Sequence, residues 1–112
     1  MTHNELFSKL MVKGEREFNL NETLLVLRSN QSIYWSWGVS KLVNLQNKGL
    51  IMKVNGHHHK GWVLITLGWE DLYKVYIVSN TGNTLDQYEG IFFDQLVEVI
   101  DDRIERIPNY KF

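Results

Sequence analysis

The segment from residue 50 to residue 80 constrains the fold of this chain more than any other. It contains three apolar runs of strand length separated by turn sequences: Leu50–Val54, Trp62–Leu67 and Tyr73–Val78. The Asn55-Gly56 pair between the first two runs is typical of a two-residue type I′ hairpin turn. The middle run is apolar on both faces except at Thr66, which predicts a central strand covered on both sides. The segment therefore predicts an antiparallel sheet.

Two further segments extend this predicted sheet. Residues Ile33–Ser40 alternate apolar and polar side chains, a pattern that predicts a half-buried strand running on loosely to Leu45. Asn47-Lys48-Gly49 then supplies a turn with a residue able to take positive φ. Thr84–Tyr88 is short and polar, as expected of an edge strand.

Apolar residues at helical spacing flank the strands on both sides. Leu6, Phe7, Leu10 and Met11 predict a helix over residues 3–13. A second short helix is expected from an Asn21 N-cap to Ser29-Asn30, although its apolar run, residues 24–27, also fits a strand. After Ile91 a helical stripe returns, and Pro108 is expected to end that helix; the stripe comprises Phe93, Leu96, Val97, Ile100, Ile104 and Ile107.

Helices at both ends of a run of strands predict an α+β fold rather than alternating β-α-β units. We expect a meander of four to six antiparallel strands, with short N-terminal helices and one C-terminal helix packed on it. A chain of 112 residues is the size of one domain, so residues 1–112 are predicted to form a single unit.

Several of these strand and turn residues resemble a known group of proteins. They are Lys60-Gly61, Ile65, Leu67, Asp71 and Tyr73, followed by Glu89-Gly90-Ile91-Phe92, Asp94 and Leu96. Over residues 50–100 the chain is similar to small uncharacterised proteins of bacteria and of their phages or other mobile elements. The resemblance implies the same order of strands followed by a helix. It implies no activity and no catalytic residue.

Composition narrows the classes of function. Lys and Arg number 12 and Asp and Glu 13, so the chain lacks the net positive charge of a dedicated DNA-binding protein. Cysteine is absent, which excludes disulfides and thiolate chemistry. We see no signal peptide, and no apolar run reaches the ~20 residues of a membrane span. We therefore expect a cytoplasmic protein that does not enter the membrane.

His57 and His59 are the candidate metal ligands. With a tight turn at Asn55-Gly56, His57 would pair with Val54 and His59 with Met52, which puts both imidazoles on one face. No third ligand stands at zinc-type spacing. The favoured interpretation is a solvated hairpin tip, and the alternative is a metal-dependent enzyme centred on these two histidines.

The second sheet face is the candidate interaction surface. If helices cover only the other face, an apolar patch is left bare, and monomers rarely expose such a patch. Either the N-terminal helices or a second subunit must cover it, so a homodimer, another homo-oligomer or a protein partner is expected. The candidate residues are Ile51, Trp62, Leu64, Leu72, Tyr76 and Val78, with Tyr34 as a further exposed aromatic residue.

A nucleic-acid-associated accessory protein is the alternative. Lys53 and Lys60 surround Trp62, and exposed aromatics among basic residues form stacking platforms for single strands. Trp35 and Trp37 share a face with Ile33 and Val39, so we expect these two to be core residues. The acidic C-terminal helix would leave only part of the molecule open to nucleic acid.

Signatures of catalysis are missing. The sequence contains no G-x-S-x-G, no phosphate loop, no dinucleotide fingerprint and no H-E-x-x-H. We therefore predict a non-enzymatic protein without a cofactor that acts by association, with nucleic-acid binding and metal-dependent catalysis as the second and third hypotheses.

Overall fold

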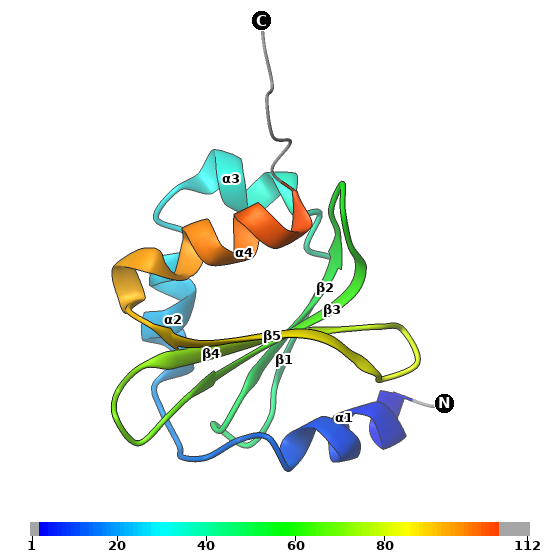
Figure 1. Cartoon of the computed structure of the whole chain (residues 1–112), viewed down its shortest axis with the longest axis vertical. Helices are drawn as coiled ribbons and strands as arrows, with labels where there is room; N and C mark the ends of the chain where they lie inside the picture. Colours follow the sequence, from blue (N-terminus) through cyan, green and yellow to red (C-terminus); the bar gives the residue numbers. More distant parts are fainter. Residues whose placement is uncertain (1–2, 106–112) are drawn as a thin grey trace, which may run out of the picture.

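A five-stranded antiparallel sheet with helices on both faces forms the described part of the protein (Figure 1). The computed structural model describes residues 3–105, with side chains from residue 5 onward. The strands follow one another as a meander in the order β1-β2-β3-β4-β5. They are β1 (Lys41–Asn44), β2 (Leu50–Asn55), β3 (Lys60–Leu67), β4 (Tyr73–Val78) and β5 (Thr84–Ile91). The predicted α+β class and meander are confirmed.

The helices divide between the two faces of the sheet. Helix α1 (His3–Met11) packs alone on one face, and the others pack on the opposite face (Figure 1). Those others are α2 (Leu20–Leu27), α3 (Gln31–Ser36) and α4 (Leu96–Ile104), the last preceded by the 3-10 turn η1 (Phe93–Gln95). No helix of the described residues is long and apolar enough to cross a bilayer.

The alternation of side chains in the strands produces two separate apolar clusters. On the three-helix face, Val63 and Ile65 of β3 pack with Leu27 of α2 and Leu96 of α4. On the α1 face, the cluster comprises Leu6, Leu10, Leu45, Ile51, Trp62, Leu64, Tyr76 and Val78. Strand β3 is buried on both sides and lies in the middle of the sheet, as predicted.

The strand predicted over Ile33–Ser40 is wrong, because its first half belongs to helix α3 and its second half is a turn that leads into β1. The Asn30 side chain caps the helix by accepting from the Ile33 amide at 3.2 Å. Tyr34 and Trp37, three residues apart, then fall on the buried side, while Trp35 is 74% exposed. Ile33 and Trp37 are four residues apart and so also share one face of a helix, which means that this short alternation does not distinguish a helix from a strand.

Trp37 joins the end of α3 to helix α4 and strand β2. Its indole Nε1 donates to the Asp101 carboxylate of α4 at 3.0 Å, and its carbonyl accepts from the Asn55 amide of β2 at 2.9 Å. The indole is fully buried, as expected from the sequence, whereas the same expectation for Trp35 is wrong.

The β2–β3 turn also differs from the prediction. Asn55 pairs with Lys60 and Val54 with Gly61, so residues 56–59 form a four-residue loop instead of a two-residue turn at Asn55-Gly56. The predicted pairings of His57 with Val54 and His59 with Met52 are therefore wrong. Positive φ at two successive residues, which a type I′ turn requires, occurs instead in the β1–β2 turn, at Gln46 (52°) and Asn47 (60°).

Smaller differences concern where elements begin and end. Asn19, rather than Asn21, caps α2, and its side chain accepts from the amides of Asn21 and Glu22. Strand β5 extends beyond the predicted Tyr88 to Ile91, and α4 begins at Leu96. Ile107 and Pro108, which were predicted to complete and end the C-terminal helix, lie outside the described residues.

Candidate functional site

Helix α1 covers the sheet face that the sequence nominated for interaction. Ile51 and Leu64 are fully buried, Trp62 is 1% exposed and Tyr76 is 5% exposed. The Phe7 ring of α1 stands edge-on to the Trp62 ring, with centroids 5.6 Å apart. The two covers expected from the sequence were the N-terminal helices and a second subunit. The N-terminal helix α1 covers these residues, which therefore form a core.

The other two residues of the predicted interaction set lie elsewhere. Leu72 belongs to the β3–β4 turn and is half-buried. Tyr34 lies in the three-helix layer, where its ring packs 5.7 Å from the Trp37 ring and the Arg28 guanidinium lies 5.4 Å from its centroid. The structure therefore does not bring Tyr34 or Leu72 into the buried α1 cluster.

The histidine loop packs against the end of α4. The His58 amide donates to the Ile104 carbonyl at 2.7 Å, and the His57 amide donates to the Glu105 carboxylate at 2.6 Å. The first of these bonds satisfies a backbone carbonyl that a helix C-terminus otherwise leaves without a partner. The loop thus has a clear structural role as a cap for α4.

His57 and His59 occupy different surroundings. The His57 side chain is exposed, whereas His59 is 6% exposed and its Nε2 lies 3.1 Å from the Trp62 carbonyl, to which it donates. Burial lowers the pKa of His59, and the hydrogen bond to Trp62 opposes that shift. Among the described residues, no group of three or more His, Cys, Asp or Glu side chains is placed to hold a metal ion.

An exposed aromatic group lies at the end of the sheet formed by the β3–β4 turn. Because Tyr73 pairs with Ile91, this turn and the β5–η1 junction are neighbours. Trp69 is 73% exposed, Phe92 57% and Phe93 65%. We call these three residues the aromatic end.

Helix α2 borders the aromatic end. The Thr23 hydroxyl of α2 hydrogen-bonds the Tyr73 hydroxyl at 2.8 Å, and α2 lies against η1. Its outward side presents Leu25, which is 72% exposed.

Carboxylates dominate the charge around the aromatic end. Arg16 is paired with Asp71 at 2.5 Å and also lies 5.8 Å from the Trp69 ring. Lys74 donates to Glu15 at 2.9 Å, and this bond raises the pKa of Lys74. Beyond these paired residues, the turn, α2, β5 and η1 carry the acidic residues Glu22, Glu70, Glu89 and Asp94.

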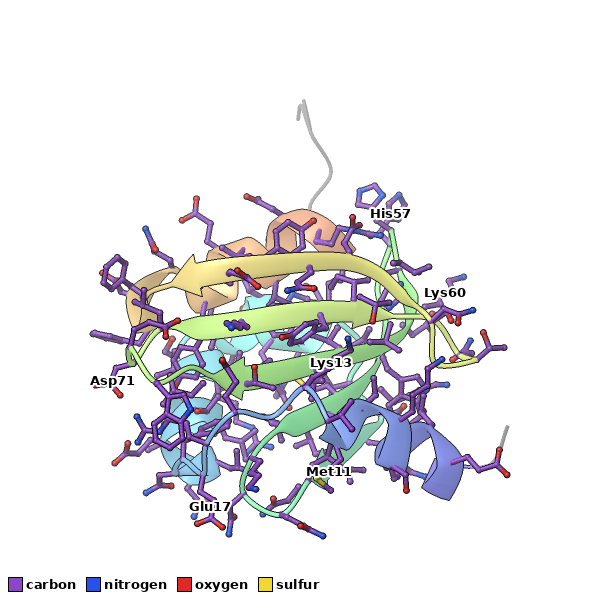
Figure 2. All side chains as sticks on the ribbon, turned by 60° about the horizontal axis from the view of Figure 1, so that its bottom comes forward. Met11, Lys13, Glu17, His57, Lys60 and Asp71 are labelled. Atoms are coloured by element: carbon purple, nitrogen blue, oxygen red, sulfur yellow. The ribbon has the colours of Figure 1, made fainter. Side chains whose placement is uncertain are left out.

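The opposite end of the sheet is basic. Lys41 and Lys53 are directly paired across β1 and β2, and Lys60 lies on the same face of the neighbouring strand β3. We call these three residues the lysine end. Figure 2 shows Lys60 and Asp71 at opposite ends of the sheet.

Open grooves separate some of the surface elements. One groove of about 490 Å³ lies between the α2–α3 corner and the start of α4, and another of about 430 Å³ lies beside the start of α2. Asp94, Glu98 and Asp101 line the first groove, and Asn19, Asn21, Asn44 and Asn47 line the second.

The sequence indicated part of the lysine end as a candidate site but did not indicate the aromatic end. Lys53 and Lys60 were named as candidates, but Trp62, which was grouped with them, is buried. Phe93 was predicted to belong to the apolar stripe of the C-terminal helix, and this is wrong, because Phe93 lies in η1 before α4 and is 65% exposed. The available signal for the aromatic end was the apolar pair Phe92-Phe93. The chain matches no protein-family model, no curated protein sequence and no solved structure at a significant level.

Proposed function

We propose that this protein is a non-enzymatic interaction protein that binds another protein through its aromatic end. The observation that carries the proposal is the exposure of Trp69, Phe92 and Phe93 on two neighbouring segments at one end of the sheet. Aromatic side chains bury large apolar areas and are enriched where proteins bind each other. Association remains the favoured function, but its surface moves from the sheet face to the sheet end.

The charges around the aromatic end define the chemistry of the partner. Glu22, Glu70, Glu89 and Asp94 would oppose an acidic surface, and the two cations at this end already have carboxylate partners. A partner that brings apolar side chains flanked by lysine or arginine fits both features. A homo-oligomer formed by two aromatic ends would bring the same acids together, so we favour a different protein over a second copy.

Cross-linking from single positions tests this proposal. A photo-reactive phenylalanine analogue at position 93 is expected to cross-link to one defined protein in cells, and the product is identified by mass spectrometry. Leu85 of β5 is the matched control position, because it is also exposed, at 52%, but lies toward the other end of β5. Equal cross-linking from positions 85 and 93, or none from position 93, would contradict the proposal.

The oligomeric state is measured on the same protein. Sedimentation velocity at low and moderate salt is expected to show a monomer, because like charges keep two aromatic ends apart. A stable dimer that Phe93→Ser converts to monomer would instead make a second copy the partner. We also propose that the protein works in the cytoplasm and belongs to the small bacterial and phage-associated proteins that residues 50–100 resemble; the cysteine-free sequence supports the first of these proposals.

A further inference from the structure

We propose that the lysine end binds the phosphate backbone of nucleic acid without reading its sequence. This inference is independent of the protein partner proposed above, because the lysine end and the aromatic end lie at opposite ends of the sheet (Figure 2). It revises the nucleic-acid hypothesis by replacing base stacking with contacts to phosphate.

Two like charges lie side by side at the lysine end. Lys41 and Lys53 are direct partners across the antiparallel β1–β2 pair, where like charges destabilise a sheet. An acidic residue at either position would relieve the repulsion, yet the sequence of β1–β4 contains no Asp or Glu. The repulsion between Lys41 and Lys53 is therefore kept, and it accompanies a concentrated positive charge on this surface.

Contacts within the protein hold one of the three lysines, Lys53, in place before any ligand binds. The Lys53 Nζ lies 4.7 Å from the centroid of the Trp62 ring and donates to the Asn80 Oδ1 at 2.6 Å. The Asn80 Nδ2 in turn donates to the Lys60 carbonyl at 3.5 Å. These contacts join β2, β3 and the β4–β5 turn, and they reduce the side-chain entropy that Lys53 loses on binding an anion.

Polar side chains of the β4–β5 turn accompany the lysines, whereas no exposed tryptophan or phenylalanine ring of the described residues does. The β4–β5 turn, which supplies Asn80, also carries Ser79 and Thr81, whose hydroxyls hydrogen-bond each other at 3.0 Å. Hydroxyls, amides and lysines together are the groups that contact phosphate and sugar in protein–DNA complexes. Trp62 is buried beneath Lys53, so it provides no stacking platform.

Nucleic acid fits this surface better than a lipid bilayer does. A protein that binds a bilayer from one side combines basic residues with aromatic or large apolar side chains that enter the headgroup region. Of the exposed aromatic residues, Trp69, Phe92 and Phe93 lie at the other end of the sheet, among carboxylates. Trp35 belongs to α3, which packs on the opposite face of the sheet from the three lysines. The lysine end therefore offers charge and hydrogen bonds to a polyanion.

The strength of binding follows from the number of phosphates neutralised. Three lysines on duplex DNA imply a slope of about −2.7 for log K against log salt concentration. Raising the salt from about 50 to about 200 mM should then weaken binding about 40-fold. Removing one lysine should reduce the slope by about 1.

Fluorescence anisotropy with a labelled random-sequence DNA duplex tests the proposal on the full chain. Lys41→Gln and Lys60→Gln are expected to weaken binding and to flatten its salt dependence. Lys48→Gln is the matched control, because Lys48 is exposed in the β1–β2 turn at the other end of the strands and its replacement removes the same charge. The control is expected to bind like the original chain.

Three results would overturn the inference. The first is the absence of salt-dependent duplex binding at about 25 mM salt. The second is a loss of affinity in Lys48→Gln equal to that in Lys41→Gln. The third is binding to vesicles containing phosphatidylserine that depends on Lys41 and Lys60, without binding to DNA. Circular dichroism of each variant separates lost binding from lost folding.

Discussion

Replacing Leu10 by Ala tests whether α1 is the structural cover of the second sheet face. Leu10 is 1% exposed and packs in the cluster formed with Ile51, Trp62 and Leu64. A buried Leu→Ala replacement costs about 2–5 kcal/mol through lost transfer free energy and the cavity left behind. A helix of nine residues is not stable alone, so this loss falls on the docking of α1.

Amide hydrogen exchange measures how much Leu10→Ala weakens the docking of α1. A cost of about 3 kcal/mol raises the equilibrium constant for undocking by roughly 140-fold, because each 1.4 kcal/mol is about a factor of ten. The exchange rates of the α1 amides are expected to rise by about this factor in Leu10→Ala. Val12→Ala is the matched control, because Val12 belongs to the same segment but is 83% exposed.

The same variant reports on self-association. Undocking of α1 uncovers Trp62, Leu64 and Tyr76, and a bare apolar face of this kind promotes association. Sedimentation velocity is therefore expected to detect oligomers in Leu10→Ala but not in Val12→Ala. A change of less than about threefold in α1 exchange in Leu10→Ala would refute the assignment of α1 as the cover.

Three further predictions concern the other face and the histidine loop. Trp37→Phe removes a hydrogen bond to a carboxylate and should lower the free energy of unfolding by about 1.5–3 kcal/mol, whereas exposed Trp35→Phe should change it by less than about 0.5 kcal/mol in urea titrations. Tyr73→Phe leaves the buried Thr23 hydroxyl without this partner and should cost about 1–3 kcal/mol in the same assay. Burial lowers the folded-state pKa of His59 from 6.5, so the unfolded chain binds more protons than the folded chain below pH 6.5. The free energy of unfolding should therefore decrease as pH falls from 6.5 through the lowered pKa. Above pH 6.5 it should stay level. Unfolding at pH 7.5 and 5.5 measures this decrease, which His59→Gln should reduce; an unchanged decrease would assign it to other groups.

Periodicity in the sequence was sufficient to predict strands β2, β3 and β4 and the terminal helices. The β2, β3 and β4 segments alternate or are apolar throughout, and turn residues separate them, so local pattern and final structure agree. Helices α1 and α4 carry their apolar residues at helical spacing and were recognised for the same reason. Each of these predictions depended on residues close together in the chain.

The failures occurred where local patterns were ambiguous. In Ile33–Ser40 the alternation of apolar residues was compatible with a helix, and the Asn30 cap and the burial of Tyr34 and Trp37 decided for α3. At Asn55-Gly56 the strong turn sequence did not form the predicted turn. The loop is longer because its amides at His57 and His58 bond to the end of α4, about 45 residues away in the chain.

For the candidate interaction surfaces, too, the sequence determined one part and the tertiary structure the other. The sequence by itself determined that the sheet has two apolar faces, because strand residues alternate sides with a period of two. Only the tertiary structure decided that α1 covers the second face, since the hydrophobic effect is non-directional and a helix or a second subunit would bury that face equally well. It also decided that Trp62 is core while Trp69, Phe92 and Phe93 are exposed, because exposure depends on which segments of the chain pack beside a residue.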